Sequence, residues 1–498
     1  MKEKPSERIF EIIPGMLSWI IITGILVLFF LKPVLAAIFL ILYLVFWVCR
    51  LLYMSSLMVL AHHRMISKRD VDWLALCRGV KADICLDDVW HVVLYTVYNE
   101  PAQLIEESLT ALKNTIYPKD KLIVVLAGEA REEKSFTKLE GIKNKFVEEV
   151  KDIQVIIHPK EIKEEIFGKG ANATFAAKKI KLYLAEKGIN LGKVIISCFD
   201  ADTCPDKKYF SCLTYHFLSD PKRYQVSFQP LPIYNNNIYK VPAFARIIEM
   251  GSTFWQLIES MRYEKFITFS SHSMSFRTLV DVGYWPVDLI SDDSLIFWKC
   301  FLKFKGDYRT YPLEVPVYMD IAVGRNILYT IAVQYKQKRR WAWGVETFAY
   351  AGVRFLDNKD IPWLVKVKRL LQLLDNHINW ATWSIIISFI TPAVLFWAKT
   401  MESDSLIFFN LSYIKSVIFH SLFFILLLCA FISKEFIPPR PKGVSPFIFV
   451  VFTLQWLFVP FVSAILGSMP ALDAQTRFML GGKFVFYPTP KRREDKSD

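Results

Sequence analysis

Long apolar runs lie at both ends of the chain, and shorter apolar runs alternate with polar stretches between them. Near the N-terminus, Ile12–Leu31 carries no charge and reaches the length of about 20 apolar residues that crosses a bilayer. A second apolar run begins at Pro33 and ends near Arg50. The first run is too long for a signal peptide, and no small-residue cleavage site follows it. We therefore predict a transmembrane hairpin over residues 1–61.

The C-terminal part of the chain contains three further apolar runs, Trp380–Trp397, Val417–Ile432 and Phe447–Leu466. Before them, Trp363–Leu374 interleaves basic and apolar residues. This pattern predicts an amphipathic helix in the membrane interface, with a surface helix of a soluble domain as the alternative. Residues 362–470 are therefore expected to form an interfacial helix and C-terminal transmembrane helices.

Residues 62–361 contain no spanning run. Short runs rich in valine and isoleucine alternate there with helix-like stretches, which predicts an α/β domain with a mainly parallel sheet. Ligands of such sheets bind beyond the carboxyl ends of the strands, so the polar residues at those ends are the first candidates for a site. The strand-like runs are His91–Tyr98, Lys121–Ala127, Ile153–His158 and Lys193–Phe199.

Composition agrees with a soluble domain joined to membrane segments. Of the 498 residues, 53% are hydrophobic and 22% are charged. The formal net charge of +13 fits an anionic lipid surface or an anionic substrate. Nucleic acid is not expected as a partner, because neither a basic, aromatic-laced groove pattern nor a zinc module is present. The eight cysteines form no C-x-x-C pair, as expected for reduced thiols of a cytosolic domain.

Charge also predicts the orientation of the chain. Basic residues precede the first apolar run and follow the second, so both ends of the hairpin and the central domain are expected in the cytosol. For the tail, residues 471–498, two arguments conflict. Three C-terminal crossings would place the tail outside, whereas its basic residues favour the cytosol. Pro460 interrupts the last apolar run and permits a re-entrant segment, so we predict a cytosolic tail.

Two carboxylates, Asp200 and Asp202, follow the fourth strand-like run. Spaced at i and i+2, they can share one divalent cation. Mg²⁺ and Mn²⁺ favour carboxylate oxygens and keep positions open for phosphate. Such a cation would offset the charge of a departing diphosphate. The alternative is a turn with solvated acids.

A second acidic pair, Asp292 and Asp293, follows Ser291 and precedes an apolar helix-like stretch. One interpretation is structural, with Ser291 as the N-cap and the acids in the first helical turn. The other is a general base, because inverting sugar transfer needs a carboxylate that takes the proton of the acceptor hydroxyl.

Gln337, Arg340 and Trp341 share one face of a predicted basic helix. Tryptophan can stack on a sugar, arginine can pair with a diphosphate and glutamine can donate hydrogen bonds. The alternative is a juxtamembrane basic helix with a buried tryptophan. Lys169 opens another predicted helix, whose free N–H groups could help it bind an anion. His272 stands alone, which favours a structural role.

Taken together, these residues resemble family 2 glycosyltransferases, in particular the cellulose, chitin, hyaluronan and poly-N-acetylglucosamine synthases. The similarity runs from about Val92 to Trp343. It implies a GT-A-type, Rossmann-like cytosolic domain joined to multi-pass transmembrane helices. The motifs that carry it are Tyr98-Asn99-Glu100, Asp200-x-Asp202, Ser291-Asp292-Asp293 and Gln337-x-x-Arg340-Trp341.

The resemblance assigns roles to these residues. It implies that Asn99 and Glu100 contact the donor nucleotide and that Asp293 is the base, with Asp292 the next candidate. Lys169, from its place at a helix start, is a further candidate for the donor site. Gln337, Arg340 and Trp341 would meet the acceptor and the diphosphate, while Asp200 and Asp202 would hold the metal and the donor. In the tail, Phe486, Thr489 and Lys491 fit the F-x-x-T-x-K gating loop of cellulose synthases.

The chain departs from the family pattern at two positions. The second strand of the family ends in an acidic pair that reads the nucleobase, whereas here the sequence is Leu126-Ala127-Gly128-Glu129, which leaves only Glu129 as a candidate. The middle residue of the acceptor motif is aspartate, which is shorter than glutamate.

The expected function is therefore inverting transfer from a nucleotide-sugar, a UDP-sugar in the first instance, to a growing polysaccharide at the cell membrane, with export of the product. Transfer of one sugar to a lipid is the alternative, because only about three C-terminal spans are available for a channel. A transporter or scaffold without chemistry is a third class. The sequence indicates no particular protein partner.

Overall fold

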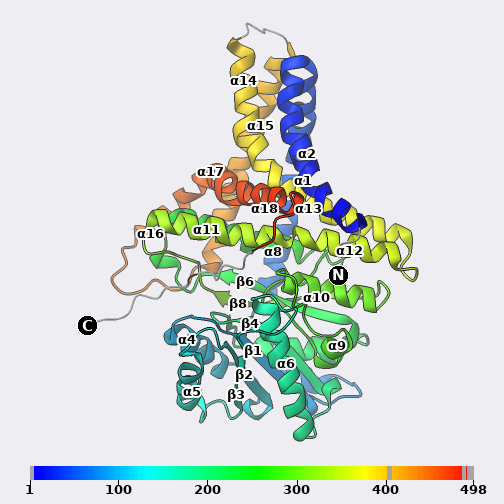
Figure 1. Cartoon of the computed structure of the whole chain (residues 1–498). Helices are drawn as coiled ribbons and strands as arrows, with labels where there is room; N and C mark the ends of the chain where they lie inside the picture. The colour runs from blue at the N-terminus through cyan, green and yellow to red at the C-terminus, as the bar shows by residue number, and fades with distance from the viewer. Residues whose placement is uncertain (1–4, 401–405, 485–489, 491–498) are drawn as a thin grey trace.

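The computed structural model describes residues 5–400, 406–484 and 490. A sheet domain carries a bundle of long apolar helices on one side, and further helices lie across the base of that bundle (Figure 1). The sheet has eight strands in the order β3-β2-β1-β4-β7-β6-β8-β5. The strands are β1 (Trp90–Thr96), β2 (Leu122–Glu129), β3 (Ile153–His158), β4 (Val194–Asp200), β5 (Cys204–Pro205), β6 (Val226–Tyr234), β7 (Ser273–Ser275) and β8 (Arg309–Met319).

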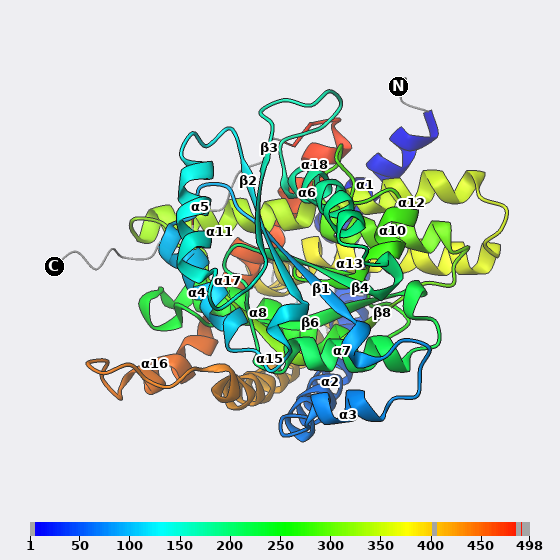
Figure 2. The same ribbon diagram turned by 90° about the horizontal axis from the view of Figure 1, so that it is seen from below.

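The predicted α/β class and its four strands are confirmed. Strands β3, β2, β1 and β4 are all parallel, as are β6 and β8, whereas β7 and β5 are antiparallel to their neighbours. Both faces of the parallel part are covered, so its strands are apolar along almost their whole length. In Figure 2, α4 and α5 lie on one face of the sheet and α6 and α10 on the other.

The helices of the domain alternate with the strands, as right-handed crossovers require. They are α3 (Trp73–Gly79), α4 (Ala102–Lys113), α5 (Ser135–Phe146), α6 (Lys169–Glu186), α7 (Tyr209–Ser219), α8 (Ala243–Glu259), α9 (Phe276–Asp281), α10 (Asp292–Lys303), α11 (Ile327–Ala342) and α12 (Glu346–Asp357). A short 3₁₀ turn, η6 (Trp343–Val345), joins α11 directly to α12.

Among the described residues, five helical segments are long and apolar enough to cross a membrane, judged by length and composition. They are Ser6–Leu31, Pro33–Ser67, Trp363–Ala398, Leu406–Phe436 and Ile448–Met479. The helices within them are α1 (Pro5–Leu31), α2 (Pro33–Ser67), α13 (Trp363–Ile385), α14 (Thr391–Thr400), α15 (Leu406–Ser433), α16 (Ile448–Leu454), α17 (Val459–Ser463) and α18 (Met469–Met479).

Two helices continue where the sequence predicted that they would end. The second helix does not end near Arg50 but continues to Ser67, and Arg50 forms an ion pair with Asp375 of α13 at 2.9 Å. The predicted interfacial helix 363–374 is also not separate, because α13 continues to Ile385 and passes through the π-helical turn η7 (Ile386–Ile390) into α14. The ion pair instead joins α13 to α2 at the level of Asp375.

The last apolar run is broken, as its proline predicted. Pro460 lies in the first turn of α17, and the 3₁₀ turn η9 (Gln455–Phe458) separates α17 from α16. A π-helical turn, η10 (Ala464–Ser468), leads into α18. In Figure 1, α18 runs across the base of the bundle formed by α1, α2, α14 and α15.

Candidate active site

The carboxyl ends of the parallel strands bring the predicted acidic and nucleotide residues to one edge of the sheet. Thr96, the last residue of β1, pairs with Asp200 of β4 on one side and with Ala127 of β2 on the other. Glu129 at the end of β2 pairs with His158 at the end of β3. Helix α6 begins above the same edge, because its first residue, Lys169, reaches Asp200.

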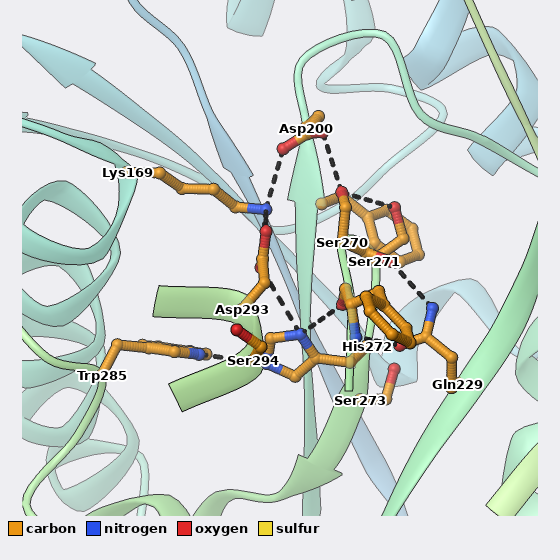
Figure 3. A network of polar contacts seen from close by, with 12 residues as sticks. Lys169, Asp200, Gln229, Ser270, Ser271, His272, Ser273, Trp285, Asp293 and Ser294 are labelled. Carbon is orange, nitrogen blue, oxygen red and sulfur yellow. Dashed lines mark hydrogen bonds and ion pairs between the residues drawn. The ribbon is translucent and has the colours of Figure 1, made fainter. Parts of the chain in front are cut away.

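Lys169 joins the two acidic motifs (Figure 3). Its Nζ lies 2.8 Å from Oδ1 of Asp200 and 2.9 Å from Oδ1 of Asp293. Burial lowers the pKa of Lys169, but the two carboxylates outweigh it and hold that pKa well above its usual value. The lysine is therefore cationic and bridges the two carboxylates of Asp200 and Asp293.

The two acids of the D-x-D motif have different environments. Asp200 is accessible, and its Oδ2 accepts a hydrogen bond from Ser270 Oγ at 2.8 Å. Asp202 is only 1% exposed, and its Oδ2 accepts the backbone N–H of Asp320 at 2.8 Å. Carboxylate oxygens are the ligands that Mg²⁺ and Mn²⁺ prefer, so these two residues are the candidates for holding such an ion. Asp202 also ties β4 to the end of β8.

Asp292 and Asp293 begin α10 and point to different surroundings. Asp293 is accessible and contacts Lys169, whereas Asp292 is buried and its Oδ2 finds no hydrogen-bond partner among the described residues. Burial, followed by the charge of Asp293, raises the pKa of Asp292 well above its usual value, and Lys169 and Arg340 oppose this effect. Asp293 is thus the better placed of the two to meet an acceptor.

Ser291 is the N-cap residue of α10, and Asp292 and Asp293 lie in its first turn, as the structural interpretation predicted. The Ser291 side chain makes no capping hydrogen bond to α10 in the part of the chain that the structure describes. Instead, the backbone N–H of Ser291 and that of Ile290 donate to Oε1 of Glu346, at 2.7 and 3.0 Å. The acceptor motif is therefore held from outside its own helix, by a residue that sequence analysis did not select.

His272 lies within the site in a single tautomer. Its Nε2 accepts a hydrogen bond from Trp285 Nε1 at 3.0 Å, so its Nδ1 carries the hydrogen that is donated to the Phe269 carbonyl at 2.9 Å. Nδ1 is 3.6 Å from Oδ1 of Asp293. Burial lowers the pKa of His272, and the ring is neutral. Its contacts are structural, in line with the sequence-based interpretation.

The Q-x-x-R-W motif lies on α11, and only part of it faces the acidic site. Arg340 lies near enough to Asp292 to lower the pKa of that carboxyl. Trp341 is half-buried, and its ring centroid lies 6.0 Å from that of Tyr234. The side chain of Gln337 is buried. The structure therefore places Arg340 near Asp292, whereas the predicted diphosphate and acceptor roles of the motif stay predictions.

Lys338, between these residues, does not belong to a solvated basic face. Its Nζ lies 2.9 Å from Oε2 of Glu249 on α8 and 3.5 Å from the ring centroid of Trp341. Both partners of the ion pair are almost fully buried. Packing against α8 therefore turns Lys338 of this basic helix inward.

The first-strand motif is partly exposed. Asn99 is exposed, while Oε2 of Glu100 accepts the backbone N–H of Tyr98 at 2.7 Å and so closes the turn after β1. The ring of Tyr98 lies 5.1 Å from that of Phe167, which precedes α6. Asn99 is therefore free of the core and directed to solvent at the edge where a nucleotide would lie.

Glu129 is buried and paired. Its Oε2 lies 3.0 Å from Arg131 and 3.6 Å from Nδ1 of His158, whose Nε2 contacts Glu165 at 2.9 Å. Burial lowers the pKa of His158, but its hydrogen bonds to Glu129 and Glu165 outweigh burial and raise it. Sequence analysis missed Arg131 and His158, although both follow the ends of predicted strands.

The gating-loop residues Phe486, Thr489 and Lys491 lie outside the described residues. The chain that leads to them does contact α11: the ring of Phe484 lies 5.0 Å from that of Trp343, and Asp473 of α18 pairs with Arg339 at 3.0 Å.

The chain thus combines an α/β sheet, an acidic edge at the carboxyl ends of its strands and attached apolar helices. The family model described as glycosyl transferase family group 2 matches residues 195–463, and the chain belongs to this family. It is a glycosyltransferase.

Similar proteins include the poly-β-1,6-N-acetyl-D-glucosamine synthase of Staphylococcus aureus strain COL, with 25% identity over 270 residues. The match covers 53% of this chain and 57% of the synthase, so the chain spans about half the length of the curated relatives it matches.

Two solved structures are also similar. A mannosyltransferase from Pyrobaculum calidifontis, in complex with GDP-Man and Mn²⁺, has 16% identity and a TM-score of 0.44, covering 83% of this chain and 98% of its own. Residues 1–349 of S. aureus TarS, in complex with UDP-GlcNAc, have 13% identity and a TM-score of 0.38, covering 80% and 94%.

Proposed function

We propose that this glycosyltransferase moves a sugar, with inversion, from a nucleotide-sugar donor to a growing polysaccharide at the cell membrane. A UDP-sugar is the expected donor, and export of the product through the helix bundle is part of the proposal. The observation that carries it is the position of Lys169 Nζ, 2.8 Å from Asp200 and 2.9 Å from Asp293. The Lys169 side chain thus contacts both Asp200, the proposed donor-side acid, and Asp293, the proposed acceptor-side acid. This supports a single reaction site between the two acids.

In this reaction the acceptor hydroxyl attacks the anomeric carbon, and its proton passes to the carboxylate of Asp293. The bond between that carbon and the diphosphate oxygen breaks, and its electron pair leaves with the nucleoside diphosphate. Asp200 and Asp202 would hold Mg²⁺ or Mn²⁺, which supplies neutralising charge for the diphosphate when bound. Arg340 adds a second cation on the acceptor side, and Asn99, Glu100 and Glu129 are proposed to line the nucleotide edge.

The similarity to a polysaccharide synthase favours a polymer, and the five apolar helical segments favour a membrane location with a cytosolic catalytic domain. Transfer of one sugar to a lipid remains the second candidate, because the broken segment Ile448–Met479 leaves fewer straight helices for a conduit. The two candidates share the same donor site and differ only in what Trp341 and the helix bundle receive.

The test is product size. Full-length protein in membranes is incubated with a panel of radiolabelled sugar nucleotides, with and without a chelator, and products are separated into polymer, glycolipid and free sugar. Polymer supports the proposal, glycolipid supports the second candidate, and the absence of any transfer with every donor overturns both. Undiminished transfer in excess chelator removes the metal from the mechanism.

The Asp293→Asn variant tests the base. Asparagine keeps the shape of the side chain but cannot accept the proton, so transfer should fall by roughly 10²–10⁴-fold. Binding of the nucleotide-sugar, measured by protection of the full chain against thermal unfolding, should persist. A variant that turns over at the normal rate would transfer the role to another residue, with Asp292 next in line.

A further inference from the structure

Glu346 holds the acceptor motif from a neighbouring helix. It is the first residue of α12, is 6% exposed, and uses one carboxylate oxygen, Oε1, for two hydrogen bonds. The donors are the backbone N–H groups of Ile290 and Ser291, at 3.0 and 2.7 Å. These are the two residues immediately before Asp292 and Asp293.

Two successive N–H groups on one oxygen fix the orientation of both peptide planes. The backbone leaving Ser291 sets where the Asp293 side chain starts, and a base must lie within about 2.6–3.2 Å of the proton it takes. The Ser291 side chain does not cap α10 in the described part of the chain, so the bonds to Glu346 hold the backbone that leads into its first turn. Rotation of either peptide would move the carboxylate away from Lys169.

Glu346 also connects this loop to the Q-x-x-R-W helix. Only the turn η6 lies between α11 and α12, and Thr347 Oγ1 donates to the Gly344 carbonyl at 2.7 Å to stabilise that turn. Trp343 of the same turn packs on Phe484. The helix that carries Arg340 and Trp341 therefore reaches the acceptor acids through a short and well-packed connection.

The environment of Glu346 is unusual for a carboxyl that makes only backbone and neutral contacts. Burial raises the pKa of Glu346 to about 7, against the hydrogen bonds from Ser291, Ile290 and Trp343. The two N–H groups that donate to it oppose this effect, because hydrogen bonds to the ionised carboxylate favour that form.

We propose that Glu346 is a positioning residue for sugar transfer: it holds the Ile290–Ser291 backbone so that Asp293 meets the acceptor hydroxyl, and it fixes that loop to the helix that binds the acceptor. It touches neither substrate nor reacting atoms. The inference rests on the proposed function, in which Asp293 is the base.

The experiment compares Glu346→Ala, Glu346→Gln and Glu346→Asp in the full-length protein. Removal of the acceptor oxygen in Glu346→Ala should lower kcat by about 10²-fold, as expected for a misplacement near 1 Å, with little change in the donor KM. The amide oxygen of Glu346→Gln can accept the same two N–H groups, so it should restore most of kcat. Glu346→Asp withdraws the oxygen by one methylene and should give an intermediate kcat.

Glu314→Ala is the matched control, because Glu314 is also a buried glutamate but lies on β8 near Arg64 of α2, away from the acceptor motif. Each kcat is expressed per folded molecule, from thermal unfolding of the same sample. A normal kcat in Glu346→Ala overturns the proposal, as does a Glu346→Gln variant as impaired as Glu346→Ala. If Glu346→Ala does not fold, a kcat of Glu346→Asp equal to wild type overturns it.

A failure of the proposed function can be distinguished from a failure of the positioning role. An Asp293→Asn variant with normal turnover removes the base assignment whatever the Glu346 variants do. An inactive Asp293→Asn variant together with a fully active Glu346→Ala variant retains the base and removes only the positioning role.

Discussion

Replacement of Lys169 by methionine tests the central feature of the site. Methionine keeps an unbranched apolar stem but removes the cation that lies 2.8 Å from Asp200 and 2.9 Å from Asp293. The three side chains are 11%, 28% and 24% exposed, so solvent screens these pairs only in part. We expect Lys169→Met to lower both the free energy of unfolding and the activity.

The magnitude follows from the distances. At 2.9 Å and an effective dielectric constant of about 20, each pair has a gross attraction of about 6 kcal/mol. The cost of taking the ammonium out of water offsets much of this, and removal of one partner from a buried pair typically costs about 3–5 kcal/mol. We therefore expect the free energy of unfolding to fall by about 3–5 kcal/mol at pH 8.

The loss should depend on pH. Burial and the charge of Asp293 raise the pKa of Asp292, and Lys169 opposes them, so the variant should raise it further. A carboxyl with a raised pKa keeps its proton in the folded state when the unfolded chain has released it, so stability falls as pH rises above about 3.9. The destabilisation by Lys169→Met should accordingly be larger at pH 8 than at pH 5.

Unfolding of the purified full-length protein can be followed by the labelling of buried thiols, of which Cys212 and Cys300 are suitable. Lys181→Met, an exposed position on the same helix, is the control and should be neutral. If Lys169→Met unfolds like this control at both pH values, the lysine does not bridge the two acids. A larger loss at pH 5 than at pH 8 would contradict the electrostatic explanation.

Three further predictions follow from other parts of the site. Trp341→Ala should raise the acceptor KM by about 2–10-fold through lost stacking and leave donor binding intact, whereas equal losses in both would indicate collapse of its packing on Tyr234. The raised pKa of His158 means that its contacts with Glu129 stabilise the fold fully below about pH 6.5 and less as pH rises through the raised pKa. The melting temperature of the wild-type protein should therefore fall as pH rises across that range. The melting temperature of His158→Gln should lack this pH dependence. A Lys483→Cys probe in a cysteine-free active variant should react with an impermeant thiol reagent only after cells are permeabilised, and labelling of intact cells would place the tail outside.

Local sequence determined the elements that carry the site. Strands buried on both faces must be continuously apolar, which is why β1–β4 are visible as runs of valine and isoleucine. Parallel strands end at one edge, so the alternation of strands and helices predicted that Asn99 and Asp200, after the first and fourth strands, would share it. The acceptor pair Asp292-Asp293 was identified by its motif.

Tertiary packing decided which of these side chains act together. Lys338 belongs by sequence to a basic stretch, and only the approach of α8 with Glu249 makes it a buried partner. Asp375 of α13 belongs by sequence to a polar stretch, and only the packing of α2 supplies its partner, Arg50.

The same holds for the centre of the site. No periodicity links Lys169 to Asp293, or Glu346 to the Ile290–Ser291 backbone, because these contacts join elements far apart along the chain. Sequence fixes periodicity and local charge, which set which elements form and which of their faces are apolar. Side-chain direction at a contact depends on how two elements pack, and the energy of a buried charge depends on the partner that this packing supplies. For that reason the sequence by itself determined which acidic residues are candidates for the site. Only the tertiary structure decided that Lys169 bridges two of them and that Glu346 holds the backbone before Asp292 and Asp293.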